Sequence, residues 1–321
     1  MQLVTFALGG FRAQPGVLVD DAVVVVRSVL GADAPRTVAE LLGRPADLQR
    51  LRLAVERTRG EPAGALVSRS AVTLHTPLGE RVLLVCAGAN YRSHSLNGAP
   101  SGDRPRIAWF VKSPNAIVGP DATIELPVEF PDHVDYEGEL CVVFGRPCHR
   151  VRAEDAYDYI AGYTILNDVS ARDAWWELRD ARTGEEGRRA WTDLLLGKQF
   201  PTFAPMGPAV VTADEIGDPT DLRLITRVNG AVVQDALTRD LVVGIPELVE
   251  QFSRHFSFAP GDVISTGSPP GVGISRTPPV FLQPADEVSV AIERIGLLTN
   301  RVTADREAAD IGARARGAGN G

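Results

Sequence analysis

The chain has 321 residues, of which 44% are hydrophobic and 23% are charged, and its formal net charge is −8. This length allows a sizeable core in one large domain or two smaller ones, and the composition is ordinary for a soluble globular protein. The negative charge and the lack of a basic stripe argue against a nucleic-acid partner, and no apolar run is long enough to span a membrane.

The first 78 residues predict a small α+β domain. A capping box from Thr37 to Glu40 marks the start of a helix, because the side chains of such a pair satisfy backbone N–H groups of the first turn. The expected elements, in chain order, are short strands within 2–27, a helix opening at Val38, a second helix over 46–58 and a loop over 60–70. The domain boundary is placed near 70–80.

A second domain, predicted over 79–303, is dominated by strand signals. Asn229-Gly230 separates two apolar runs and predicts a hairpin with a type I′ turn. The other expected elements are strands over 82–87, 107–112, 263–266, 287–293 and 297–303, helices over 153–161, 170–182 and 245–256, a loop and candidate lid over 92–105, an exposed excursion over 182–189, and a flexible C-terminal tail over 304–321.

This order predicts a β-rich α+β protein. Strands do not alternate regularly with helices, and the sequence contains neither GxGxxG nor a Walker motif, which argues against a nucleotide-binding α/β fold. The absence of a GxSxG motif argues against the serine α/β-hydrolases. Cys86, Cys141 and Cys148 form no CxxC pair, and Met1 to Ala7 lacks the basic region of a signal peptide, so we expect free thiols in a cytoplasmic protein.

Two carboxylates in Glu137-Gly138-Glu139 lie within an apolar segment that is typical of a buried strand. Side chains on a strand alternate between faces, so Glu137 and Glu139 should point the same way, and Tyr136 the other way together with Leu140 and Val142. Like charges this close are costly to bury, and a divalent cation would relieve the conflict. A third carboxylate, Asp168, ends another apolar run. The alternative is a half-exposed strand with its polar face in water.

Several sequence blocks, taken in order, resemble the fumarylacetoacetate hydrolase family over roughly 80–303. The blocks are Ala89-Asn90-Tyr91-Arg92-Ser93-His94, Phe110 to Pro114, Val134 to Leu140, Gly162 to Asp173, Gly197-Lys198-Gln199-Phe200, Pro205 to Pro208, Val228-Asn229-Gly230, Pro260 to Ile264, Thr266 to Pro269 and Gly271-Val272-Gly273. The N-terminal part is similar to the short leading domain of longer members.

The resemblance implies a mixed β-roll or sandwich fold and a homodimer. It implies Mg²⁺, with Mn²⁺ as an alternative, held by Glu137, Glu139 and Asp168. The implied substrates are small dicarbonyl or 2-oxo acids, and the implied reactions are C–C hydrolysis of acylpyruvate-like compounds, decarboxylation and keto–enol isomerisation.

Chemistry assigns roles within these blocks. A divalent cation would stabilise the enolate that such reactions generate. His94 is the candidate base, because the imidazole pKa lies near working pH, and Lys198 is a catalytic cation next to the metal ligands. The candidate substrate-binding residues are Tyr91, Arg92, Lys112, Arg172, Gln199 and Thr266.

Each role has a plainer alternative. His94 is also compatible with a solvated loop side chain, Lys198 with a surface lysine, and Arg172 with a partner of Asp173 or Glu177. We interpret His133 as a surface loop residue. Asp135 is either a structural group or a support for the metal ligands.

Two positions depart from the family pattern. Many hydrolytic members carry a Glu three residues after the lid His, where this chain has Asn97, and many carry a Gln where this chain has Trp175. An amide cannot accept the proton of an attacking water. Two hypotheses therefore stand: a metal-dependent C–C hydrolase, and a 2-oxo acid decarboxylase or keto–enol tautomerase. A non-catalytic homologue is a third.

Overall fold

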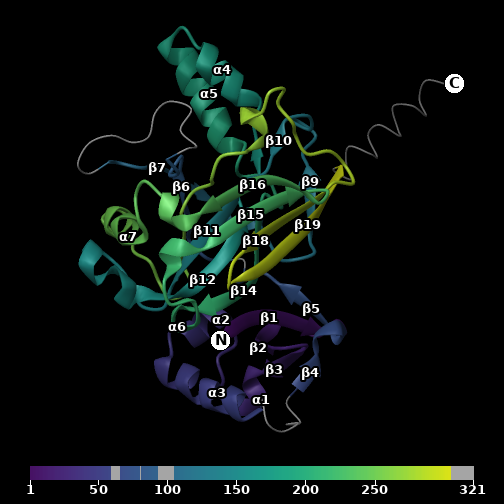
Figure 1. Cartoon of the computed structure of the whole chain (residues 1–321), viewed down its shortest axis with the longest axis vertical. Coiled ribbons are helices and arrows are strands. Elements are labelled where there is room, and N and C mark those ends of the chain that lie inside the picture. Colours follow the sequence, from purple (N-terminus) through teal and green to yellow (C-terminus); the bar gives the residue numbers. More distant parts are fainter. Residues whose placement is uncertain (59–65, 80, 93–104, 305–321) are drawn as a thin grey trace, which may run out of the picture.

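The computed structural model describes residues 1–58, 66–79, 81–92 and 105–304. These residues form mixed β-sheets with fewer helices, which confirms the predicted β-rich α+β class. Figure 1 shows the N-terminal elements at one end, the sheets in the middle and the helices α4 and α5 projecting from the opposite end. His94, Asn97, most of the predicted lid over 92–105 and nearly all of the predicted tail lie outside the described residues.

The N-terminal elements are β1 (Gln2–Leu8), β2 (Gln14–Val19), β3 (Ala22–Val25), α1 (Val26–Leu30), α2 (Val38–Leu42), α3 (Pro45–Thr58), β4 (Leu66–Ser68) and β5 (Val72–His75). The predicted strands within 2–27 and the two predicted helices are present, but helix α1 was not predicted and strand β4 lies within the predicted loop over 60–70. Thr37 caps α2 as predicted, since its Oγ1 accepts the Glu40 N–H at 3.1 Å. The Glu40 carboxylate accepts the N–H of Arg36, one residue before the cap.

The remaining strands are β6 (Leu84–Gly88), β7 (Ala108–Lys112), β8 (Ile117–Val118), β9 (Thr123–Leu126), β10 (Val134–Asp135), β11 (Gly138–Phe144), β12 (Ile160–Asn167), β13 (Ser170–Ala171), β14 (Ala204–Thr212), β15 (Arg223–Val228), β16 (Ala231–Leu237), β17 (Val263–Ser265), β18 (Glu287–Ile292) and β19 (Gly296–Ala304). The remaining α-helices are α4 (Asp173–Asp180), α5 (Gly184–Leu196), α6 (Ala213–Ile216) and α7 (Ile245–Ser253). No helix in the described part of the chain is both long and apolar enough to cross a membrane.

The largest sheet runs through both halves of the chain. Its strand order is β4-β3-β2-β1-β14-β12-β11-β17-β6-β7, with β5 paired to β1 and β8 paired to β14. A second sheet has the order β16-β15-β18-β19-β9, and β10 pairs with β13. Because β1 pairs with β14 through Gln2↔Val211 and Leu3↔Val210, the domain boundary that we propose near 70–80 crosses a continuous hydrogen-bonded sheet.

The predicted hairpin is confirmed. β15 and β16 pair antiparallel, and the turn residues Asn229 and Gly230 have φ angles of 50° and 79°. A positive φ at both central residues defines the type I′ turn, which glycine and asparagine accommodate with little strain.

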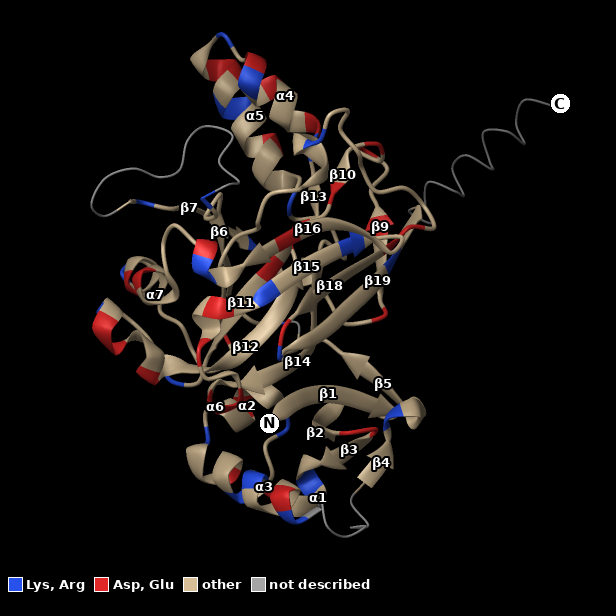
Figure 2. Ribbon diagram, in the orientation of Figure 1, with Lys and Arg blue, Asp and Glu red and all other residues tan. Residues whose placement is uncertain are grey.

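Three predicted segments of the second domain differ from the structure. The helix predicted over 170–182 begins only at Asp173, because Ser170–Ala171 forms strand β13. The excursion predicted over 182–189 is instead the first part of helix α5, because Thr183 and Glu186 form a complete capping box at its start. The helix predicted over 153–161 is a 3₁₀ helix, Ala153–Tyr159, followed directly by β12. As Figure 2 shows, α5 contains both acidic and basic residues, which is why the sequence of its first part resembled an exposed loop.

Strand β11 lies between two apolar clusters. Leu140, Val142 and Phe144 pack into one cluster, and Cys141 and Val143 into the other. The predicted grouping of Tyr136 with Leu140 and Val142 is wrong, since Tyr136 belongs to the cluster of Cys141. The reason is a break between β10 and β11 at Tyr136-Glu137, which interrupts the period-two alternation.

We predict that Thr183→Ala loosens the start of α5. Loss of a Ser or Thr cap costs about 1 kcal/mol, and an opening equilibrium shifted by this amount changes roughly fivefold. Amide hydrogen exchange should therefore accelerate to about that degree across the first turn of α5. The matched control is Thr192→Ala on the same helix, where the hydroxyl donates to the Arg188 carbonyl in mid-helix and caps nothing. Equal exchange in both variants would contradict the assigned cap.

Candidate functional site

The three predicted metal ligands converge at the break between β10 and β11. Glu137 lies in the break, Glu139 is the second residue of β11, and Asp168 follows β12. β11 and β12 pair antiparallel with Gly138 opposite Asn167, so the end of β12 lies beside the Glu-Gly-Glu segment. The Asp168 N–H donates to the Glu137 carbonyl at 2.8 Å, which joins the two ends.

These residues form a carboxylate triad, by which we mean Glu137, Glu139 and Asp168. One oxygen from each lies within 4.8 Å of the others, and their relative exposures are 7%, 1% and 1%. The half-exposed strand with a solvated polar face, the alternative considered from sequence, is therefore wrong. Three buried carboxylates at this separation require compensating positive charge.

Lys198 provides part of this charge. Its Nζ donates to Glu137 Oε2 at 2.9 Å, to Ser170 Oγ at 2.8 Å and to Asp168 Oδ2. Burial by itself lowers the pKa of Lys198, but the negative charges of Asp168 and Glu137 outweigh this effect and raise the pKa. The ammonium group therefore stays protonated, and the structure excludes the alternative of a solvated surface lysine.

Arg172 approaches the triad from another direction. Its Nε donates to Asp135 Oδ2 at 3.0 Å and its Nη2 to Glu137 Oε1 at 2.5 Å. Arg172 thus pairs with Asp135 and Glu137, and not with Asp173 or Glu177 as the alternative had it. Burial raises the pKa of Asp135, and the Arg172 charge counteracts the shift. Asp135 is a support for a predicted metal ligand.

Lys112 and Gln199, predicted to bind substrate, are engaged elsewhere. Lys112 is fully buried, and its Nζ donates to Asp168 Oδ1 at 2.6 Å and to the carbonyls of Val169 and Phe203. Gln199 accepts from the Ser113 N–H and donates to the Val111 carbonyl, each at 2.8 Å. Lys112 therefore supports Asp168, and Gln199 joins backbone segments.

Tyr91 and Thr266 present buried hydroxyl groups. Neither Tyr91 Oη nor Thr266 Oγ1 has a hydrogen-bond partner among the described residues. Burial and the charge of Glu139 raise the pKa of Tyr91, so its hydroxyl stays protonated as a donor. Arg92 is exposed, and its backbone N–H donates to the backbone carbonyl of Asp240 at 3.1 Å.

The surroundings of Glu139 indicate whether the triad could hold a divalent cation. In the described part of the chain no lysine or arginine pairs with its carboxylate, and the hydrogen bond it accepts comes from Ser265 Oγ. Burial, and then the charges of Asp168 and Glu137, raise the pKa of Glu139 well above its usual range. An all-oxygen donor set in which one carboxylate has no paired cation among the described residues suits a hard divalent ion such as Mg²⁺ or Mn²⁺.

The sequence interpretation missed the surroundings of His133. Its Nδ1 lies 2.6 Å from Asp173 Oδ1, and its ring packs edge-on against Trp176 and Phe281 at 4.8 and 5.1 Å. His133 lies in a loop outside the triad, as interpreted from the sequence, but it is partly buried and belongs to an aromatic cluster. It lies two residues before Asp135, but nothing in the local sequence indicates its distant partners.

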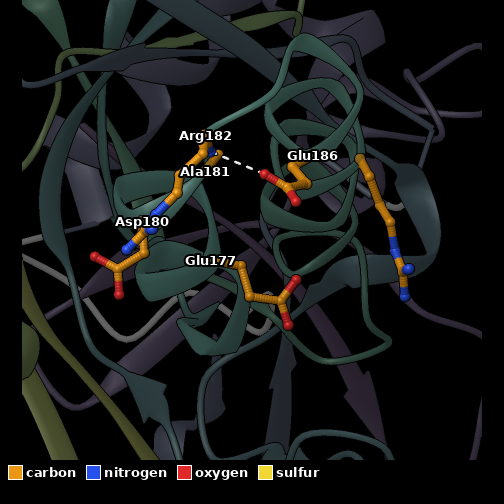
Figure 3. Close-up of a pocket in the computed structure, with 6 residues that line it drawn as sticks. Glu177, Asp180, Ala181, Arg182 and Glu186 are labelled. Atoms are coloured by element: carbon orange, nitrogen blue, oxygen red, sulfur yellow. Dashed lines mark hydrogen bonds between the residues drawn. The ribbon is translucent and has the colours of Figure 1, made fainter.

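A separate hollow of about 410 Å³ lies within the α4–α5 hairpin. Figure 3 shows its charged lining, including the hydrogen bond from the Arg182 N–H to Glu186 at 2.8 Å. The lining residues are Glu177, Asp180, Ala181, Arg182, Glu186 and Arg189. None of them belongs to the triad or to its cationic partners, so we assign this hollow no part in the site.

The chain is similar in sequence to known proteins. A human mitochondrial protein named oxaloacetate tautomerase FAHD2A is 43% identical over 238 residues, which are 74% of this chain and 71% of that protein. The oxaloacetate tautomerase YisK of Bacillus subtilis is 36% identical over 249 residues, 77% of this chain and 78% of that protein.

A solved structure of maleylpyruvate hydrolase from Sphingobium sp. SYK-6, in complex with manganese(II) and pyruvate, superposes with a TM-score of 0.74 at 29% identity. The match covers 95% of this chain and all of that one. The family model described as fumarylacetoacetate (FAA) hydrolase C-terminal matches residues 83–303, more than half of the chain. The resemblance seen in the sequence blocks is thereby confirmed, and the chain belongs to the fumarylacetoacetate hydrolase family.

Proposed function

We propose that this chain is a divalent-metal-dependent enzyme that interconverts the keto and enol forms of a small 2-oxo dicarboxylic acid of the oxaloacetate type. The observation that carries the proposal is the buried carboxylate triad with a protonated Lys198 fixed against it. The names of relatives up to 43% identical support tautomerisation, and so does Asn97, which cannot serve as the carboxylate of a water-activating dyad.

In this proposal the chain's own residues hold charge and move one proton. When bound at the triad, Mg²⁺ or Mn²⁺ would supply Lewis-acid stabilisation of an enolate oxygen. Lys198 and Arg172 keep Glu137 oriented, and Lys112 does the same for Asp168. The orphaned hydroxyls of Tyr91 and Thr266 would donate to the substrate, since substrate oxygens would satisfy these buried donors.

The proton has to leave C3 of the keto form while another joins the C2 oxygen. We assign the transfer to His94, because imidazole accepts and releases protons near neutral pH. Tautomerisation needs this exchange but no attacking water. The sequence change from Glu to Asn97 is compatible with such a reaction.

C–C hydrolysis remains the second candidate. It is favoured by the similarity, over 95% of the chain, to a solved maleylpyruvate hydrolase that holds manganese and pyruvate. In that case His94 would activate water without the Glu that many hydrolytic members carry three residues later, because this chain has Asn97 there. A decarboxylase on the same scaffold belongs to the same set of alternatives.

Association and location are also proposals. We propose a homodimer, as the family resemblance implies, and a cytoplasmic location, although the human relative is named mitochondrial. The proposed partner is a small 2-oxo acid, with no nucleic acid and no membrane surface involved.

Glu139→Gln should abolish metal binding and activity. The change keeps the side-chain volume but removes one carboxylate from the triad. We therefore expect the Mn²⁺ dissociation constant to rise by more than about 100-fold, which exceeds the effect of changing a residue that only supports a metal ligand. Isothermal titration calorimetry measures this directly. Glu56→Gln, an exposed glutamate on α3, is the matched control. Unchanged turnover in Glu139→Gln would exclude the metal mechanism.

A substrate panel separates the candidate reactions. We expect the protein to catalyse enol–keto exchange of oxaloacetate when Mg²⁺ or Mn²⁺ is present and to lose this activity when a chelator is added. The exchange is monitored by ultraviolet absorbance and NMR. Acylpyruvates and maleylpyruvate should be cleaved slowly or not at all. Metal-dependent release of pyruvate from these compounds, without oxaloacetate exchange, would establish the hydrolase instead.

His94→Ala should reduce tautomerisation strongly, because the proposal assigns its proton transfer to His94, and should reduce any C–C hydrolysis still further, because hydrolysis also requires the base to activate water. The comparison is made on the same preparation with both substrates, and His255→Ala serves as the control. Equal losses in both reactions would count against His94 as the water-activating base.

A further inference from the structure

Three consecutive backbone N–H groups, those of Tyr136, Glu137 and Gly138, lie at the break between β10 and β11. Each donates to a side-chain oxygen: Tyr136 to Asp135 Oδ1 at 2.8 Å, Glu137 to Asn167 Oδ1 at 3.0 Å, and Gly138 to Gln234 Oε1 at 2.9 Å. All three acceptor side chains are at most 1% exposed. A buried N–H without a partner is costly, so these side chains hold the segment in place.

Gln234 differs from the other two acceptors in where it comes from. Asp135 and Asn167 are chain neighbours of the predicted ligands, whereas Gln234 lies on β16, at the edge of the second sheet. The hairpin of β15 and β16 packs against β11 (Figure 1). A single side chain from another sheet therefore reaches the peptide between the two glutamates of the triad.

The other end of the Gln234 amide is also occupied. Its Nε2 donates to Ser268 Oγ and to the Pro269 carbonyl, each at 2.8 Å. Ser268 follows Thr266, one of the buried hydroxyls without a partner, by two residues. Gln234 thus joins the ligand segment to the segment proposed to contact substrate.

Packing leaves little freedom around this contact. A Cβ added to Gly138 would lie 2.3 Å from Thr226 Oγ1 and 2.9 Å from Val290 Cγ1, so the second sheet approaches the backbone of Gly138 directly. To bond the Gly138 N–H from the second sheet, a side chain has to be long enough to reach that N–H and able to accept a hydrogen bond. Gln234 meets both conditions.

We propose that Gln234 is a positioning residue of the metal centre. By accepting the Gly138 N–H it sets the orientation of the Glu137 and Glu139 carboxylates relative to each other, and by donating to Ser268 and Pro269 it couples that orientation to the segment of Thr266. The inference rests on the proposed metal function of the triad. It concerns a residue that contacts neither metal nor substrate.

The test is Mn²⁺ binding to Gln234→Met, measured by calorimetry and by electron paramagnetic resonance of free Mn²⁺. Methionine keeps the length and removes both hydrogen-bonding ends, so we expect the dissociation constant to rise roughly 10- to 100-fold, as for other residues that orient metal ligands. Urea unfolding, followed in the same samples with chelator, reports separately on stability.

Thr226→Val is the matched control. Thr226 is buried on the neighbouring strand β15, faces Gly138, and its Oγ1 has no partner among the described residues. Removing this hydroxyl should leave Mn²⁺ affinity unchanged and stability unchanged or higher, because no hydrogen bond is lost.

Gln234→Met could lose stability and still bind Mn²⁺ with a dissociation constant within about twofold of the wild type. That change is well below the effect of ligand-orienting residues, and this result would overturn the positioning role. If that variant does not fold, Gln234→Asn is measured, which withdraws the amide by one methylene. It should still weaken Mn²⁺ binding at least about fivefold, and an unchanged affinity overturns the proposal equally. Absence of Mn²⁺ binding by the wild-type protein would instead contradict the proposed metal function itself.

Discussion

The burial of three carboxylates in one place is the constraint on which the rest of the site depends. Desolvation opposes the charged forms of Glu137, Glu139 and Asp168, and their mutual repulsion adds to this cost. Compensation arrives from three separate elements: Lys112 ends β7, Arg172 precedes α4, and Lys198 follows α5. The cations cover Glu137 and Asp168 but leave Glu139 without one in the described structure, which is where a divalent ion would contribute most.

The α4–α5 hairpin owes its position to this charge balance. Arg172 and Lys198 lie at its two ends, and the Ala171 N–H donates to the Gly197 carbonyl at 2.8 Å, which closes the base. A Cβ on Gly197 would lie 2.5 Å from the Ala171 carbonyl oxygen, so only glycine allows the two ends to approach this closely. The helices project outward, while their ends carry the cations that hold Glu137. The projecting hairpin is therefore tied to the carboxylate triad through its base.

Local signals predicted much of the molecule. Asn229-Gly230 indicated the β15–β16 turn because its positive φ angles are a local property. Thr37 indicated the start of α2 because its cap is a hydrogen bond to the N–H of Glu40, three residues further along the chain. The same kind of signal at Thr183 and Glu186 was masked by the high charge of α5, and the helix was missed. The contacts of His133 were not foreseen because its partners, Asp173 and Phe281, are distant in sequence.

The amino-acid order supplies the chemical groups: two carboxylates two residues apart, a third after an apolar run, and ordered blocks characteristic of one family. Their arrangement in space depends on how the strands pair and pack. In the folded chain Lys112, a candidate substrate ligand, donates to Asp168, and Asp135 accepts from Arg172. Gln234, from a second sheet, accepts the Gly138 N–H. The physical reason is that hydrogen bonds and ion pairs between distant segments depend on sheet pairing and packing, which local residue patterns do not encode.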